Sequence, residues 1–348
     1  MLIAFLLPLK TILWYYLIRE KQMKKKTKII LSCVGAFLAL LFVALMIYFF
    51  GASYPQFNKI SQTEFEIPGL STNFCPQGLT YSESHEVFMV SGYMSNGKSS
   101  RVYFINKGDK KANKFITFKL DGADYTGHSG GIATSGNYAW IAGDKKVVRF
   151  NLLDALNCPN GEAINLIDSF ETNNGADYIL TYNNKLIVGE FYREKKYPSP
   201  DSHKIKTSNN KINPALSFIY TINEDNLCGV ETTKPEAAIS TIEKVQGMTF
   251  TKDGNIVLST SYSLPDSKLY VYNNVLGGNP TTTVNINNET IPVYMLDDNV
   301  LIKTITAPCM SEEVVLVNNR VYVLFESACK KYKLFTRTRS TNVYSLDI

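Results

Sequence analysis

The sequence is poor in the residues that build metal clusters and nucleic-acid surfaces. Its 348 residues include three histidines and six cysteines, with no C-x-x-C pair and no Cys/His cluster. This argues against a zinc site. Beyond residue 28, the 29 basic and 30 acidic side chains nearly cancel. Because neutralising phosphates supplies most of the affinity for nucleic acid, we expect no nucleic-acid partner.

One long stretch of the chain lacks charge altogether. Residues 29–50 are 22 uncharged, mainly apolar residues. As a helix they would extend about 33 Å, enough for a hydrocarbon core of about 30 Å. We therefore predict a transmembrane helix that contacts membrane lipid. A cleaved signal peptide is the alternative, although its apolar core is normally shorter.

The basic residues before this helix predict its orientation. Lysines cluster between Lys21 and Lys28, and a positive flank usually stays in the cytoplasm. Residues 1–28 are thus expected to be cytoplasmic or membrane-associated, with residues 51–61 as a linker and residues 62–348 as an extracellular domain on the cell membrane of a bacterial-type cell. Residues 1–22 are themselves apolar, so a second membrane helix, an interfacial stretch and a true start at Met23 all stay open.

From about residue 62 onward the sequence repeats a set of short strand patterns. Each repeat has a first strand, a second strand after a tight turn and a third after a longer connection, and four repeats have a weaker fourth strand. The first strands begin with the segments GLTYSES, GIATSG, YILTYNN, GMTFTKDG and VVLVNNR. We predict an all-β fold, a β-propeller of five blades. Six blades, or a sandwich or other β fold, are the alternatives.

The end of the chain predicts how the ring closes. The last repeat stops after its third strand, and residues 63–67 lie just before the first repeat. These residues could supply the missing outer strand, which would remove an exposed sheet edge.

Polar residues at the starts of first strands and the ends of second strands should converge on one mouth of the central channel. We expect a small-molecule ligand to contact four of them, namely Gln77, His128, Gln246 and Glu312. Glu190 and Glu326 each follow an apolar strand with no adjacent basic residue, which suits a hard-cation ligand or a general base. The alternative is a carboxylate held by backbone amides, and Gln77 and Gln246 could equally be strand caps.

Two further features are predicted from their positions. Residues 193–214 form the longest insertion and should lie over the same mouth, as a lid, a partner-binding loop or a solvated loop. Hairpin pairing of Val317 with Arg320 would bring Cys309 close to Cys329, so a disulfide is plausible there. Cys158 and Cys228 are a weaker candidate pair.

The repeated strand order resembles the propellers of gluconolactonases, paraoxonases and strictosidine-synthase-like proteins. The resemblance implies calcium bound by Glu, Asn and Asp side chains on the channel, a role that Glu190, Asn174 and Glu326 would take here. Our leading hypothesis is a membrane-anchored binding or scaffold propeller with a ligand site at the channel mouth. A calcium-dependent lactone or ester hydrolase using His128 is the alternative, and a structural role with an envelope partner is a third. Whether the chain is an enzyme stays open.

Overall fold

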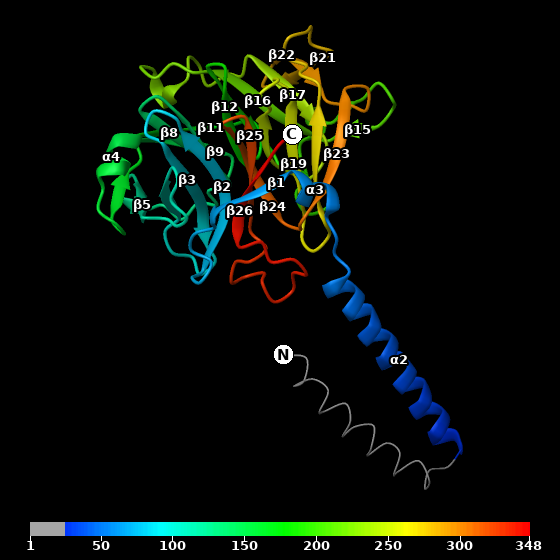
Figure 1. The fold of residues 1–348 in the computed structure, drawn as a ribbon. Helices are drawn as coiled ribbons and strands as arrows, with labels where there is room; N and C mark the ends of the chain where they lie inside the picture. Colours follow the sequence, from blue (N-terminus) through cyan, green and yellow to red (C-terminus); the bar gives the residue numbers. More distant parts are fainter. Residues whose placement is uncertain (1–24) are drawn as a thin grey trace. The chain divides into compact units, whose positions relative to one another are not determined.

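The computed structural model describes residues 25–348, which form two separate units. Predictions that fall on residues 1–24 lie outside this range. The first unit contains α2 (Lys25–Phe50), which matches the expected apolar segment (Figure 1). Among the described residues, α2 is the one helix long and apolar enough to cross a membrane. Both a retained anchor and a signal sequence have this character.

The second unit, Tyr54–Ile348, is a β-propeller. It opens with α3 (Pro55–Ile60), where proline in the first turn favours helix formation because its φ is already helical. Residues 61–348 then form five blades, each built on four antiparallel strands. The expected all-β fold with five blades is confirmed.

The blades follow one another along the chain. The first contains β2 (Phe74–Ser82), β3 (Val87–Met94), β4 (Arg101–Asn106) and β5 (Lys114–Leu120). The second contains β7 (Gly131–Ser135), β8 (Tyr138–Gly143), β9 (Lys146–Asn151) and β11 (Asp168–Glu171). The third contains β12 (Tyr178–Tyr182), β13 (Lys185–Gly189), β16 (Ala215–Thr221) and β17 (Ala237–Thr241). The fourth contains β18 (Val245–Phe250), β19 (Ile256–Thr260), β20 (Ser267–Tyr272) and β23 (Leu301–Ala307). The fifth contains β24 (Ser311–Val317), β25 (Arg320–Phe325), β26 (Asn342–Leu346) and β1 (Ser61–Glu66).

Two ends of the chain close the ring, as predicted. Strand β1 pairs antiparallel with β26, with Ser61 opposite Leu346 and Thr63 opposite Tyr344. The innermost strands β2, β7, β12, β18 and β24 contact one another in sequence, and β24 returns to β2. The closing strand begins two residues earlier than expected. Strand β1 thus completes the fifth blade, whose other strands come from the C-terminal part of the chain.

Tight hairpins fix the register inside the blades. Asn183-Asn184 connects β12 to β13, and Asn318-Asn319 connects β24 to β25. Both residues of each pair have positive φ. Two consecutive residues of this kind are typical of the type I′ turn, whose twist matches that of the flanking strands.

The prediction of one outer strand at residues 163–170 is wrong, because this segment forms two strands in different blades. Residues Ala163–Asn165 form β10, which pairs parallel with β5 of the first blade, whereas β11 pairs with β9 of the second. A helix, α4 (Leu152–Asn157), precedes them. The segment therefore covers the edge of one blade before it completes the next.

An unpredicted hairpin extends the third blade. Strands β21 (Thr282–Ile286) and β22 (Glu289–Met295) are inserted between the third and fourth strands of the fourth blade, and β22 pairs parallel with β17 (Figure 1). The apolar core lies between blades, where Trp140, Phe150 and Phe218 are almost fully buried.

Candidate functional site

A cavity of about 1070 Å³ opens at one mouth of the ring. Six of the seven residues predicted for the site line it, namely Gln77, His128, Asn174, Glu190, Gln246 and Glu326. The seventh, Glu312, is buried beside Glu326. A second cavity, of about 690 Å³, is lined by the far ends of the inner strands. Six of the predicted site residues thus lie together at one mouth of the ring, as the strand order indicated.

Three of the predicted site residues lie at register shifts of the inner hairpins. The register of the inner hairpins shifts between Pro76 and Gly78, between Val245 and Gly247, and between Ser311 and Val314. Gln77, Gln246 and Glu312 occupy these irregular positions. An extra residue in one strand re-aims a side chain, and such bulges are frequent beside functional sites.

Glu313, which the sequence reasoning missed, occupies the middle of the ring. Its carboxylate accepts hydrogen bonds from the backbone N–H groups of Leu79 (2.8 Å), Ile132 (2.9 Å) and Ile179 (3.1 Å). These residues belong to three different blades. Burial raises the pKa of Glu313 well above its ordinary value, and the three donors act in the opposite direction. Glu313 therefore connects the inner strands, and both of its carboxylate oxygens already accept hydrogen bonds from the protein.

Small residues make room for this carboxylate. A Cβ added at Gly131 would lie 2.8 Å from Glu313 Oε1, and one added at Gly247 would lie 2.6 Å from Glu313 Cα. Both glycines begin the regular part of an inner strand. A glutamate within an apolar strand, opposite glycines at the matching position of other repeats, was the available signal.

Glu312 and Glu326 form a pair of buried acids at the cavity wall. Glu312 is 2% exposed, and its Oε1 has no hydrogen-bond partner among the described residues. Glu326 Oε2 accepts a hydrogen bond from Gln77 Nε2 (2.9 Å). Burial raises the pKa of Glu326 to about 8, and burial together with the neighbouring Glu326 raises the pKa of Glu312 well above its usual range. At neutral pH the pair therefore carries a proton, which lies between the two carboxyl groups.

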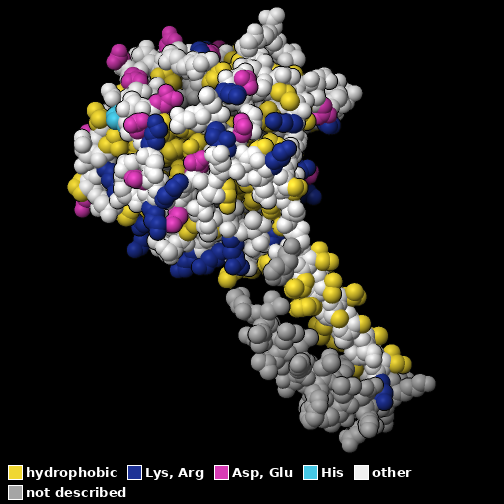
Figure 2. Space-filling view, viewed as in Figure 1, with side chains coloured by type: hydrophobic (Ala, Val, Ile, Leu, Met, Phe, Trp, Pro, Cys, Tyr) yellow, Lys and Arg dark blue, Asp and Glu magenta, His cyan; other side chains and the backbone are white. Residues whose placement is uncertain are grey.

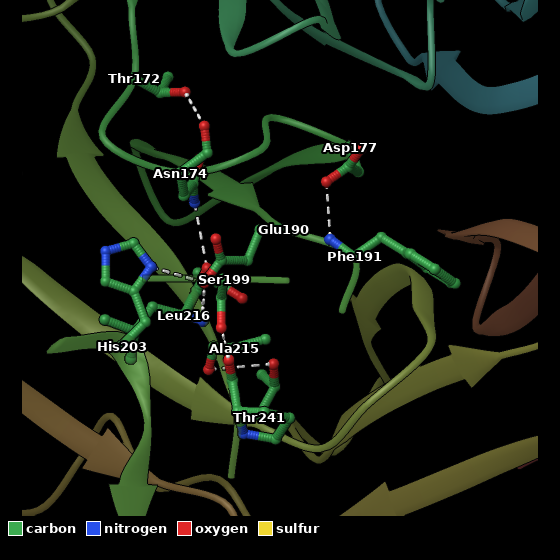
Figure 3. A network of polar contacts seen from close by, with 12 residues as sticks. Thr172, Asn174, Asp177, Glu190, Phe191, Ser199, His203, Ala215, Leu216 and Thr241 are labelled. Carbon is green, nitrogen blue, oxygen red and sulfur yellow. Dashed lines mark hydrogen bonds and ion pairs between the residues drawn. The ribbon is translucent and has the colours of Figure 1, made fainter. Parts of the chain in front are cut away.

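Glu190 and Asn174 are occupied by protein partners (Figure 3). Glu190 Oε1 is hydrogen-bonded to His203 Nδ1 (2.7 Å) and accepts the N–H of Leu216 (2.9 Å). Asn174 Nδ2 donates to the carbonyls of Val188 (2.8 Å) and Leu216 (3.0 Å). Its Oδ1 accepts the N–H of residue 176 (3.1 Å). His203, the basic partner of Glu190, lies 13 residues further along the chain, inside the insertion. Inspection of the residues next to Glu190 therefore did not reveal that its carboxylate is paired.

This network fixes the long insertion over the cavity. His203 ends the short 3₁₀ turn Asp201–His203 within residues 193–214 and is itself buried. The preceding segment, residues 196–200, lines the cavity wall. The insertion thus lies at the mouth where the topology placed it, and Glu190 connects it to the third blade.

Two of the three expected calcium ligands, Asn174 and Glu190, are engaged by protein groups. Ca²⁺ takes six to eight oxygen ligands, whereas Asn174 Oδ1 and Glu190 Oε1 already accept protein hydrogen bonds. Within residues 25–348, no group of three or more His, Cys, Asp or Glu side chains could hold a metal ion. Calcium binding by Glu190, Glu326 and Asn174 stays a prediction from the resemblance.

Two other titratable groups line the cavity. Burial raises the pKa of Asp177 to about 7, although its Oδ2 accepts the N–H of Phe191 (2.7 Å). Burial lowers the pKa of His128, whose ring packs against Tyr93 with 4.8 Å between centroids. His128 is therefore largely neutral at neutral pH and can either donate or accept a hydrogen bond.

The predicted disulfides are absent, and all six cysteines are free. The expected pairing of Val317 with Arg320 is present, but the bulge between Ser311 and Val314 shifts the register before it reaches Cys309. Cys329 instead lies against Cys75, with 3.7 Å between the sulfur atoms. The Cys309 thiol donates to the carbonyl of Thr338 (3.6 Å). Cys158 and Cys228 are likewise unpaired.

Comparisons with known proteins show likeness in structure only. No protein-family model and no curated protein sequence matches the chain. Among solved structures, the PQQ-bound aldose sugar dehydrogenase of Streptomyces coelicolor is 11% identical, with 82% of this chain and 96% of that chain covered and a TM-score of 0.44. A putative oxidoreductase (glucose dehydrogenase) of Thermus thermophilus is 11% identical, with coverages of 82% and 99% and a TM-score of 0.39. Hydrazine synthase of Kuenenia stuttgartiensis is 10% identical, with coverages of 72% and 80% and a TM-score of 0.38.

Proposed function

We propose that this chain is a membrane-anchored, extracytoplasmic binding protein that holds a small polar ligand at the mouth of its propeller. The carrying observation is the buried acid pair Glu312 and Glu326: Glu326 lines the cavity, and Glu312 Oε1 has no donor among the described residues other than this acidic neighbour. A buried polar atom without a partner is costly, and a ligand that bonds to it would remove that cost. The anchor would be α2.

The wall of the cavity favours an uncharged ligand that has both hydroxyl or amide groups and a flat apolar face. Tyr93, Tyr197, Tyr262 and Tyr332 supply aromatic surfaces and phenol groups. Gln77 and Gln246 add amides. Aromatic rings stack on flat apolar faces while amides and protonated acids bond to hydroxyls, a mixture typical of small-molecule sites.

Ligand binding can be tested on the full chain in detergent by a thermal-shift screen of sugars, polyols and small amides. A binder should raise the melting temperature of the wild type. In the double variant Glu312→Gln, Glu326→Gln its Kd should weaken by about tenfold or more, because a charge-assisted or strongly polarised hydrogen bond is lost. Glu231→Gln, at an exposed carboxylate, is the matched control. The proposal fails if no compound in the panel stabilises the protein, or if the double variant binds as tightly as the wild type.

A second candidate is a hydrolase of lactones or esters, as the sequence suggested. It is favoured by two acids whose pKa values near neutrality, about 7 for Asp177 and about 8 for Glu326, suit general acid–base catalysis in one cavity. Turnover of a lactone panel, lost in Glu326→Gln and in His128→Ala, would support it. Loss on chelation would favour the calcium-dependent form, and a panel without turnover would exclude these substrates.

A further inference from the structure

The connection between β25 and β26 carries a concentrated positive charge. Residues 329–341 contain five basic side chains and no Asp or Glu: Lys330, Lys331, Lys333, Arg337 and Arg339. Figure 1 shows this connection in red, extending from the ring, and Figure 2 shows Lys and Arg side chains gathered on that part of the domain. An unbalanced basic patch of this kind favours a negatively charged partner.

Two large apolar side chains lie exposed within the basic segment. Leu334 is 71% exposed and Phe335 is 64% exposed. Neither belongs to the buried core of the propeller, and a leucine as exposed as Leu334 gains free energy when an apolar partner covers it. Apolar residues flanked by lysine and arginine are typical of segments that enter the interface of a lipid bilayer.

Hydrogen bonds fix the segment on both sides of the exposed Leu334 and Phe335. Thr336 is buried, and its hydroxyl donates to the carbonyl of Ser327 (2.8 Å). The N–H of Ser340 donates to the hydroxyl of the same Ser327 (3.0 Å). The N–H groups of Tyr332 and Lys333 donate to the carbonyl of Cys329.

The segment is also bound to the residue at which the propeller unit begins. The Tyr54 hydroxyl donates to Asp266 Oδ1 (2.7 Å) and is hydrogen-bonded to Thr338 Oγ1 (3.1 Å). Asp266 in turn forms an ion pair with Arg337. Tyr54 follows Phe50, the last residue of α2, by four positions. The helix and the residue that binds this segment are thus close neighbours in the sequence.

We infer that residues 330–339 dock on the surface of a bilayer that contains anionic phospholipid, with Leu334 and Phe335 in the interface and the lysines at the headgroups. The inference rests on α2 being a retained anchor, as proposed above. A second copy of the same surface fits less well, because two segments that each keep four basic side chains besides the paired Arg337 would repel each other. Lys331, Tyr332 and Phe335 also line the cavity, so docking would bring its mouth to the lipid.

Limited trypsin digestion of the full chain in lipid nanodiscs tests the inference. The discs contain phosphatidylcholine alone or mixed with phosphatidylglycerol, and mass spectrometry follows cleavage within residues 329–341. We expect cleavage to be about tenfold slower in anionic discs, since each basic residue near such a surface adds attraction. High salt should remove much of this protection because it screens the charges. Cleavage at the exposed Lys252, in the turn after β18 at the far ends of the inner strands, serves as an internal reference that lipid should not change.

The double variant Leu334→Ser, Phe335→Ser keeps every trypsin site and should lose the protection. Leu227→Ser, at an equally exposed leucine in another loop, is the matched control and should keep it. Equal cleavage in the two kinds of disc would overturn the inference. Protection that is equal in the two kinds of disc, and that disappears when each disc holds one copy of the chain, would also overturn the inference. It would indicate that a second copy of the chain covers the segment. Retention of the chain in discs after an alkaline wash shows that the anchor holds, so an unprotected loop then counts against docking alone.

Discussion

Two consecutive glutamates of strand β24 have opposite surroundings. Glu313 faces the centre of the ring, where three backbone N–H groups from three blades bind its carboxylate. Glu312 is buried beside Glu326, and its Oε1 has no donor among the described residues other than this acidic neighbour. Both side chains are almost fully buried. Burial of an acid therefore does not by itself indicate a ligand site; the proposed site rests on burial without enough donors.

The same distinction separates the two acids that the sequence offered as metal ligands. Glu190 accepts hydrogen bonds from His203 and from the backbone of Leu216, and it holds the insertion in place. Glu326 has Gln77 on one oxygen and an acidic neighbour, and its pKa is raised to about 8. Glu190 thus resembles Glu313 in being satisfied by the protein, whereas Glu326 shares the unsatisfied environment of Glu312.

The contrast between satisfied and unsatisfied acids is tested most strongly at Glu313, where we expect the largest loss of stability. Replacement of Glu313 by Gln keeps the shape but places an amide NH₂ against backbone donors. We expect the free energy of unfolding to fall by about 2–4 kcal/mol, because buried N–H groups lose their acceptor. Urea denaturation of the full chain in detergent measures this. The matched variant Glu312→Gln should lose under about 1 kcal/mol or gain stability. Equal losses would contradict the distinction.

A smaller effect is expected from pH. The pKa of Glu326 rises from an ordinary 4.5 to about 8 in the folded protein, and that of Asp177 from 3.8 to about 7. The folded state then binds more protons than the unfolded state, so stability is full below the unfolded pKa and is lost as pH rises through the folded pKa. Between about pH 5 and about pH 9 the wild type should lose about 2 kcal/mol more than Glu326→Gln, after allowance for partial solvent screening. Parallel curves for the two proteins would mean that Glu326 does not titrate in this range.

The smallest effect is expected at the insertion. His203→Ala removes the partner of Glu190, and we expect a loss of about 1 kcal/mol in global stability, because the Leu216 N–H still binds the carboxylate. Local opening should increase more, so trypsin should cut residues 193–214 several-fold faster. His85→Ala, at a surface turn, is the control. An insertion that stays resistant in His203→Ala would show that other contacts hold it.

Much of the fold could be predicted because its signals are local. Alternating strands and paired asparagine turns, such as those at Asn183 and Asn318, specify hairpins within a few residues. Repetition of the hairpins predicted the blades, and the missing last strand predicted closure by residues 63–67, where the structure has the closing strand at residues 61–66. The parallel pairing of β10 with β5 was not predictable in this way, since no local pattern in residues 163–165 indicates which strand they pair with.

The candidate site shows the same limit. Sequence position brought Gln77, Gln246 and Glu326 to one mouth, because antiparallel strands fix which ends meet. The Cys75–Cys329 contact depended on a one-residue bulge before Val314 that no local pattern revealed.

The sequence by itself determined an apolar helix, a repeated all-β unit and the face on which polar groups gather, since each depends on periodicity along the chain. Only the tertiary structure decided which buried acid is satisfied. Glu312 and Glu313 are neighbours with the same chemistry, and the donors that distinguish them come from blades about 130 to 240 residues away. Hydrogen bonds over such distances exist only once the ring has closed.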